Sequence, residues 1–207
     1  MAKFSFSLAL LFVCVLCTFG TVEPRNPRGR QFRGGPYIEA CKGTRFPDLC
    51  IRCLSGFPNS TIQNPQQLAQ VALSVSLYRA RHTRSFLLDA AKQLERMKAR
   101  EYPTVKDCLQ QIDDSVFQLS QSIRELRRME TAPVSDNFFW HISNVETWTS
   151  AALTDASTCL DEFPAGRNTS KLKATIKGKV LNVAQVTSNA LALFHLYAAK
   201  YQTKTKP

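Results

Sequence analysis

Apolar residues recur every three or four positions along four long stretches of this 207-residue chain. This period places apolar side chains on one face of an α-helix. Prolines at positions 58, 103, 133 and 164 fall between the stretches, where they do not interrupt helical hydrogen bonding. The pattern therefore predicts four long amphipathic helices joined by short connections.

Local signals give expected bounds for these helices. Asn64 is the expected N-cap of the first, which starts at Pro65 and ends at about Arg100. The second begins at Thr104, whose hydroxyl is expected to cap it. The third spans 135–161, and the fourth begins near Ser170. The stripe expected for the first helix consists of Leu68, Val71, Val75, Tyr78, His82, Phe86, Ala90, Leu94 and Met97. The corresponding stripes of the other three helices consist of Val105, Leu109, Ile112, Val116, Leu119, Ile123 and Leu126; Phe138, Ile142, Val145, Thr149, Ala152, Ala156 and Cys159; and Ile176, Val180, Val183, Thr187, Ala190, Phe194 and Tyr197.

Four helices of this length with short loops predict an all-α fold, an up-down-up-down four-helix bundle. The bundle is expected at 64–200, preceded by a short helical hairpin at 37–57 and followed by a tail at 201–207. Strand-period patterns are not evident. Hairpin and bundle together form one expected domain, 37–200.

The first 36 residues read as two segments outside that domain. Residues 1–20 contain Lys3, an apolar run from Leu8 to Leu16 and small residues at the end, the layout of a cleavable secretory signal. The run is too short for the roughly 20 residues of a membrane span. Residues 21–36 are basic and rich in Pro and Gly, as expected of a disordered arm. We expect a secreted protein with no membrane span.

Five cysteines follow the signal segment, and secretion favours disulfides among them. Cys108 lies 25 positions before Pro133 and Cys159 lies 26 positions after it. If the second and third helices are antiparallel about that turn, the two cysteines lie side by side and can form a disulfide. In the hairpin, spacing allows either Cys41–Cys50 or Cys41–Cys53, so one thiol remains free.

The net charge of +11, from 27 Lys and Arg against 16 Asp and Glu, does not indicate nucleic-acid binding. Residues 37–199 carry only +4, and the remaining charge lies at the two ends of the chain. Basic groups must cluster on a folded face to bind nucleic acid. In a secreted protein, the polyanion expected to bind the basic arm is a polysaccharide or a membrane surface.

Motifs for catalysis, cofactors or metals are absent from the sequence. The three histidines lie on separate predicted helices, and His82 is expected as a hydrogen-bonded core residue. Trp148, beside the stripe of the third helix, fits a core position better than an interface position, although exposed tryptophans anchor interfaces. Asn59 and Asn168 begin N-glycosylation motifs in predicted loops.

Three segments resemble the plant invertase and pectin methylesterase inhibitor family. They are the Cys41-x8-Cys50 hairpin, Cys108 followed by the acidic pair Asp113–Asp114, and the string VETWTSAALTDASTCLD at 145–161. The resemblance covers nearly the whole chain after the arm and implies a four-helix bundle behind a disulfide-closed hairpin. One departure is the extra thiol at Cys53, because the family's unpaired cysteine often lies in the last bundle helix.

The resemblance implies a noncatalytic inhibitor in the apoplast or cell wall, without cofactors. It implies a one-to-one complex in which the bundle covers the pectin-binding cleft of a pectin methylesterase. By motif position, the partner-facing residues are Asp114, Glu146, Thr147, Trp148 and Asp161. The alternatives are inhibition of cell-wall or vacuolar acid invertase, for which the family's Pro-Lys-Phe tripeptide is lacking, and a noninhibitory wall-binding protein whose arm contacts pectin.

Overall fold

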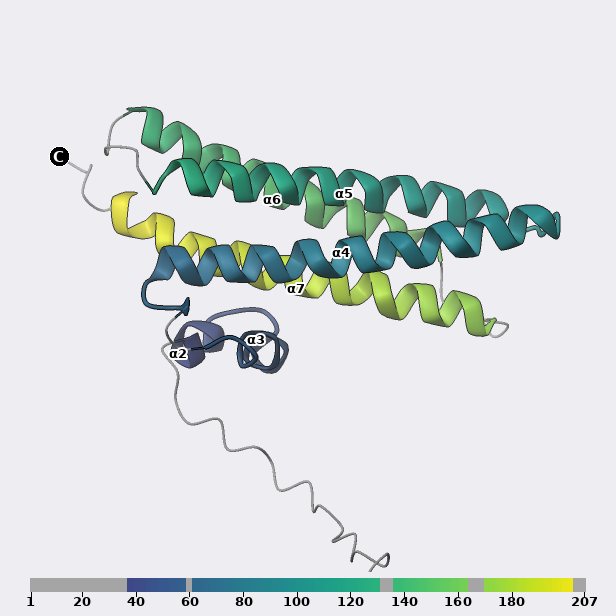
Figure 1. Ribbon diagram of the computed structural model, residues 1–207, viewed down its shortest axis with the longest axis horizontal. Helices are drawn as coiled ribbons and strands as arrows, with labels where there is room; N and C mark the ends of the chain where they lie inside the picture. The colour runs from purple at the N-terminus through teal and green to yellow at the C-terminus, as the bar shows by residue number, and fades with distance from the viewer. Residues whose placement is uncertain (1–36, 59–60, 131–135, 164–169, 203–207) are drawn as a thin grey trace, which may run out of the picture. The chain divides into compact units, whose positions relative to one another are not determined.

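The computed structural model describes residues 37–58, 61–130, 136–163 and 170–202. In these ranges the regular structure is helical throughout, which confirms the predicted all-α class. A short pair, α2 (Tyr37–Lys42) and α3 (Pro47–Leu54), precedes four long helices (Figure 1). The long helices are α4 (Pro65–Arg96), α5 (Tyr102–Arg128), α6 (Asp136–Asp161) and α7 (Lys171–Gln202).

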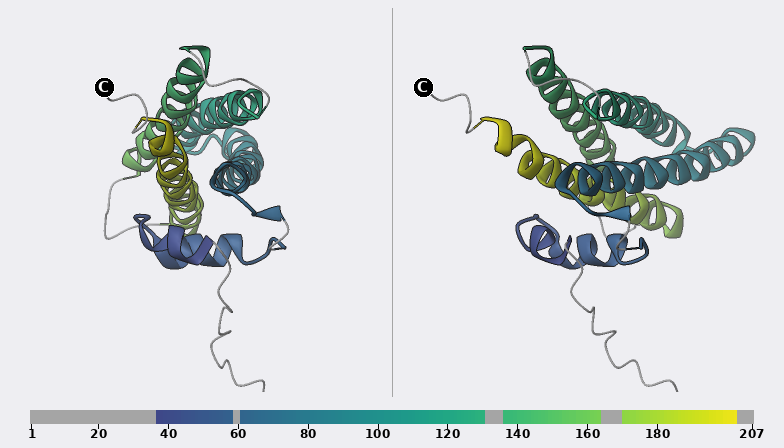
Figure 2. Two further views of the ribbon diagram at one scale, coloured as in Figure 1. Left: turned by 90° about the vertical axis from the view of Figure 1, so that its left-hand side faces the viewer. Right: turned by 60° about the vertical axis from the view of Figure 1, so that its left-hand side comes forward.

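Each long helix packs against two others around a shared core (Figure 2). Helix α4 contacts α5 and α7, and α6 contacts the same two helices from the other side. Helices α4 and α5 are antiparallel, because Gln66 Nε2 donates to the Leu126 carbonyl at 3.3 Å while Arg84 pairs with Asp113. Helix α7 extends two residues beyond the expected domain end at 200.

A disulfide and buried hydroxyls join α5 to α6. Cys108, near the start of α5, bonds to Cys159, near the end of α6, with a Cα–Cα distance of 4.6 Å. Farther along the pair, Ser115 Oγ donates to the Ala152 carbonyl at 2.9 Å. Thr149 Oγ1 donates to Ser122 Oγ at 3.1 Å. These contacts order the two helices antiparallel, as the cysteine spacing required.

The α2–α3 hairpin is closed by a disulfide between Cys41 and Cys50, with a Cα–Cα distance of 5.6 Å. Cys53 is the free thiol among the described cysteines, so the alternative Cys41–Cys53 pairing is not formed. Thr44 Oγ1 donates to the Cys41 carbonyl at 2.7 Å and tightens the turn. Both α2 and α3 contact α7, so the hairpin packs on the bundle.

Helix ends agree with the sequence at some positions and differ at others. Asn64 caps α4, and its Oδ1 accepts from the Gln67 N–H at 2.9 Å. The expected end near Arg100 is wrong: α4 stops at Arg96, because Lys98 adopts a left-handed φ of 50°. The expected Thr104 cap is also wrong. Helix α5 starts at Tyr102 and has Pro103 in its first turn. Proline is tolerated there because the N–H groups of the first turn have no intrahelical acceptor.

The expected apolar stripes of α6 and α7, from Phe138 to Cys159 and from Ile176 to Tyr197, are buried throughout. The stripe of α4 needs correction, because Tyr78, His82 and Met97 are exposed and His82 is not a core residue. The buried face of α4 instead includes small and hydroxyl residues, which a hydrophobic pattern counts as neutral or polar. It contains Leu73, Ser76, Ala80, Thr83, Leu87, Ala91 and Leu94.

Several predicted features fall outside the described residues. They are the signal segment 1–20, the arm 21–36, both glycosylation asparagines, Asn59 and Asn168, and positions 203–207 of the tail. Among the described helices, none has both the length and the apolar character to cross a bilayer.

Candidate partner-binding surface on α5 and α6

A polar row lies along the seam between α5 and α6. Asp114 and Gln118 are one turn apart on α5, and Asp155 lies on the facing side of α6. Gln118 Nε2 donates to Asp155 Oδ2 at 2.8 Å. The Gln118 Oε1 atom is buried and has no hydrogen-bond partner among the described residues. The row therefore contains one buried acceptor whose hydrogen-bonding capacity the described residues leave unused.

An aromatic pair lies on the same seam. Phe117 of α5 and Trp148 of α6 meet edge to face, with ring centroids 6.1 Å apart and ring planes at 87°. Phe117 is 55% exposed and Trp148 is partly buried. Trp148 therefore lies at the boundary of the core and not within it. The pair presents aromatic surface beside the carboxylates.

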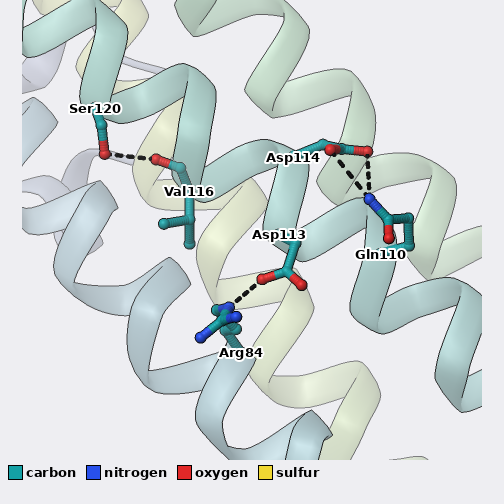
Figure 3. Close-up of polar contacts among 6 residues, drawn as sticks. All are labelled: Arg84, Gln110, Asp113, Asp114, Val116 and Ser120. Carbon is teal, nitrogen blue, oxygen red and sulfur yellow. Dashed lines mark hydrogen bonds and ion pairs between the residues drawn. The ribbon is translucent and has the colours of Figure 1, made fainter.

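The two carboxylates of the seam influence each other. Burial raises the pKa of Asp155, and the charge of Asp114 raises this pKa further. Asp114 accepts weak hydrogen bonds from Gln110 Nε2 at 3.3 and 3.4 Å (Figure 3). Asp113 points the other way and pairs with Arg84 of α4 (Figure 3). The adjacent aspartates therefore point in different directions.

The residues expected to face a partner are distributed over three sides of α6 and the adjoining α5. Asp114 and Trp148 share the α5–α6 seam. Thr147 and Asp161 are exposed on the outer side of α6. Glu146 turns toward α7, where its Oε1 lies 3.5 Å from His195 Nε2. The structure thus places Asp114 and Trp148 together, Thr147 and Asp161 on the neighbouring outer side of α6, and Glu146 apart from them against α7.

Reasoning from sequence missed three residues of this surface, Phe117, Gln118 and Asp155. Each had a signal in helical spacing. Phe117 follows Asp114 by three positions and Gln118 follows it by four, so both lie on the Asp114 side of α5. Asp155 follows Trp148 by seven, two turns along the same side of α6.

The described residues contain no arrangement suited to catalysis or metal binding. None of their His, Cys, Asp and Glu side chains form a group of three able to hold a metal ion. His141 Nδ1 lies 2.6 Å from Glu125 Oε2 at the buried α5–α6 contact, and His82 packs against the exposed ring of Tyr78. The small pocket beside the free thiol of Cys53 is lined mainly by aliphatic side chains and by no histidine.

The fold and the surface define a disulfide-joined helical bundle protein with aromatic and acidic side chains between α5 and α6. The same fold occurs in the crystal structure of a mutant form of a pectin methylesterase inhibitor from Arabidopsis, with a TM-score of 0.60 and 18% identity. That match covers 77% of this chain and 96% of the other.

Sequence comparison identifies the family. The family of plant invertase/pectin methylesterase inhibitors matches residues 37–193, and the chain belongs to it. It is 40% identical to "Pectinesterase inhibitor 9" of Arabidopsis thaliana over 198 residues, 95% of each protein. It is also 40% identical to the "21 kDa protein" of Daucus carota, over 79% of this chain and 83% of that protein. The family and these inhibitor relatives confirm the prediction that the chain is not an enzyme.

Proposed function

We propose that the protein is a secreted inhibitor that binds pectin methylesterase one to one and blocks its pectin-binding cleft. Two independent similarities support this function: a named inhibitor matches over 95% of the chain, and a crystallised pectin methylesterase inhibitor has the same fold. The chain then acts by covering a surface of another protein. This mode needs no reactive group of its own.

The observation that carries the proposal is the pair of exposed Phe117 and partly buried Trp148 beside Asp114 and Asp155. Aromatic side chains are enriched among residues that dominate protein–protein affinity, and surrounding polar groups set orientation. The pair is held on two helices joined by the Cys108–Cys159 disulfide. Such preorganisation limits the entropy lost on binding.

In this proposal, the contact surface extends from the seam to the outer side of α6. Trp148 is the central anchor, Asp114 accepts hydrogen bonds from the enzyme, and Thr147 and Asp161 contact it at the periphery. Glu146 lies at the edge of this contact surface, where its contact with His195 helps to hold α6 against α7. Protonation of the carboxylates would change the affinity, so inhibition should depend on pH.

The terminal segments receive separate roles. Residues 1–20 direct secretion to the apoplast and are then removed. The basic arm at 21–36 contacts a wall polyanion, and glycans attach at Asn59 and Asn168. These roles rest on sequence motifs and on the location of the proposed target.

The deciding experiment measures methyl-ester hydrolysis of pectin by a purified plant pectin methylesterase, with the purified inhibitor in micromolar excess, between pH 5 and 7.5. The expected result is loss of activity that saturates at one inhibitor per enzyme. Unchanged activity across this range would contradict the proposal. Sucrose hydrolysis by an acid invertase is measured in parallel, and inhibition there alone would assign the chain to the invertase alternative.

A further inference from the structure

A groove between α4 and α5 has a composition distinct from that of the partner-binding surface. Its volume is about 460 Å³, within the range of about 300–1,000 Å³ common for small-molecule sites. Each helix supplies four residues with the same spacing of three, four and seven positions. The groove is lined by Ser74, Leu77, Tyr78 and Arg81 of α4 and by Ser120, Ile123, Arg124 and Arg127 of α5.

Three guanidinium groups and no carboxylate line this groove. Arg81, Arg124 and Arg127 are all exposed, and none forms an ion pair with any described acidic residue. Neighbouring arginines behave differently, because Arg84 pairs with Asp113 and Arg128 with Glu125. The groove therefore presents three guanidinium groups that have no direct acidic partner among the described residues.

One groove arginine is positioned by an amide. With the Gln70 side chain oriented to suit both neighbours, its oxygen accepts from Arg127 Nε at 3.3 Å and its nitrogen donates to Glu130 Oε1 at 3.2 Å. This contact uses Nε and leaves the two terminal nitrogens of Arg127 for a ligand. A guanidinium with free nitrogens binds carboxylates through paired hydrogen bonds.

An aromatic ring and two hydroxyls complete the lining. Tyr78 is 64% exposed and contacts His82, with ring centroids 6.4 Å apart, so much of its ring is free. Ser74 and Ser120 each donate to a backbone carbonyl one turn earlier, at 2.8 and 2.7 Å. Figure 3 shows the Ser120 contact with Val116. Both hydroxyl oxygens keep lone pairs that accept from a ligand hydroxyl.

The geometry points to a binding site for an acidic oligosaccharide in this groove, with uronate carboxylates on Arg81, Arg124 and Arg127 and a sugar ring on Tyr78. Sugar hydroxyls donate to Ser74 and Ser120. The three arginines are spread along the helices, and about 1.5 Å of rise per residue separates successive positions. A linear chain with repeated carboxylates matches this distribution better than a single anion does.

The choice of a uronate among acidic sugars rests on the proposed function. Hydrolysis of pectin methyl esters leaves free galacturonate carboxylates, so the polymer beside the target enzyme gains the charge that this groove binds. The groove lies on the α4–α5 side and the aromatic pair lies on the α5–α6 side. The two surfaces can therefore be tested separately.

The test measures binding of oligogalacturonate by calorimetry at physiological ionic strength, with its fully methyl-esterified form and polyphosphate as comparison ligands. Wild type should bind oligogalacturonate in preference to both. The double variant Arg81→Gln/Arg124→Gln should lose about tenfold or more in affinity, because two charge-assisted contacts are removed. Lys92→Gln/Arg96→Gln has the same change in net charge on exposed α4 positions outside the groove and should retain most of the affinity.

Other outcomes would overturn the inference. Equal losses of affinity in both double variants would show that general charge attraction explains the binding. Equal affinity for polyphosphate and oligogalacturonate would show the same. Binding lost only on deletion of residues 21–36 would assign it to the arm. Tyr78→Ala provides a second test that leaves the charge unchanged, and unaltered affinity there would contradict the stacking contact. Enzyme inhibition is measured on the same wild-type preparation, so binding without inhibition contradicts only the proposed function, and inhibition without binding contradicts only this site.

Discussion

Asn189 of α7 forms two hydrogen bonds with the backbone of Phe46, a residue 143 positions earlier in the chain. Its Oδ1 accepts from the Phe46 N–H at 3.0 Å, and its Nδ2 donates to the Phe46 carbonyl at 2.9 Å. Asn189 is only 4% exposed. One buried amide therefore satisfies both backbone groups at the start of α3 and attaches the hairpin to the bundle.

Replacing Asn189 by alanine is expected to lower the free energy of unfolding by about 1–3 kcal/mol, because the partly buried Phe46 N–H loses its partner and the Phe46 carbonyl keeps only the Cys50 N–H. Urea denaturation of the purified protein measures this loss. Asn144→Ala is the matched control, since Asn144 is a partly exposed residue of α6 whose side chain forms no hydrogen bond with the described residues. Equal stability of the two variants would contradict the attaching role.

The Cys108–Cys159 disulfide provides a second prediction about stability. It joins residues 51 positions apart, so its removal gives the unfolded chain considerable additional freedom. The double variant Cys108→Ala/Cys159→Ala should lose about 2–4 kcal/mol of unfolding free energy.

Thermal unfolding without reductant measures the effect of this double variant. Cys53→Ala is the control, because Cys53 forms no disulfide with the other described cysteines. A melting temperature unchanged from wild type in the double variant would show that the disulfide does not stabilise the folded protein relative to the unfolded chain. Thiol counting by mass spectrometry checks that wild type keeps a single free cysteine.

Much of the fold was predictable because burial follows the helical period closely in α6 and α7. Each predicted core position on these helices, from Phe138 to Tyr197, is apolar or a hydroxyl residue that packs inside. The predicted antiparallel order of the second and third long helices also places Cys108 beside Cys159, where the disulfide is found. Length, period and proline positions thus carry the architecture.

Prediction failed where small polar residues replace apolar ones. Ser76 of α4 is fully buried, because its hydroxyl donates to the Ala72 carbonyl at 3.1 Å and needs no other partner. Ser76 counts as polar in a hydrophobic pattern, so the predicted stripe includes Tyr78 and His82 instead. Both of these residues are exposed. The Asn189–Phe46 contact was equally invisible, since sequence alone does not indicate which distant backbone a buried amide will meet.

The candidate surface was only partly predictable for a similar reason. Motif position supplied Asp114 and Trp148, but Phe117 and Asp155 emerge only once α5 and α6 are placed side by side. Glu146 is next but one to Trp148 in sequence and faces α7 instead. Adjacency in a helical string therefore does not establish a shared face.

Asp155 gives a prediction about pH. Its pKa in the folded protein is raised above 3.8, by burial first and by Asp114 second, so the folded state binds this proton more tightly than the unfolded state. The resulting contribution to stability is complete below pH 3.8 and is lost as pH rises through the folded pKa. At neutral pH the ionised carboxylate is therefore unfavourable for folding.

Asp155→Asn should raise the stability at pH 7 and have a smaller effect at pH 3.5. The new amide can still accept from Gln118 Nε2, and it can donate to Gln118 Oε1, which has no partner among the described residues. Urea denaturation at the two pH values measures the difference. Asp89→Asn, at an exposed carboxylate on α4, is the control. A gain at pH 3.5 as large as that at pH 7 would contradict protonation as the cause.

The aromatic pair gives the last prediction, which tests the proposed contact surface. Trp148→Ala should weaken inhibition of pectin methylesterase by about 30-fold, equivalent to roughly 2 kcal/mol, because a partly exposed tryptophan in a rigid setting is a typical binding anchor. Phe117→Ala should weaken it less, since it removes the ring that supports Trp148 edge to face. Titrations of enzyme activity with each variant give the inhibition constants.

Two further variants make this prediction specific. Leu181→Ala removes an exposed apolar side chain from α7, away from the α5–α6 seam, and should leave the inhibition constant unchanged. Because Trp148 is partly buried, its variant is first compared with wild type by thermal unfolding. Phe117 is 55% exposed, so truncating it is expected to preserve the fold. Full inhibition by each of the single variants Trp148→Ala and Phe117→Ala would place the enzyme contact elsewhere on the bundle, because each variant removes one ring of the pair on which the proposed contact depends.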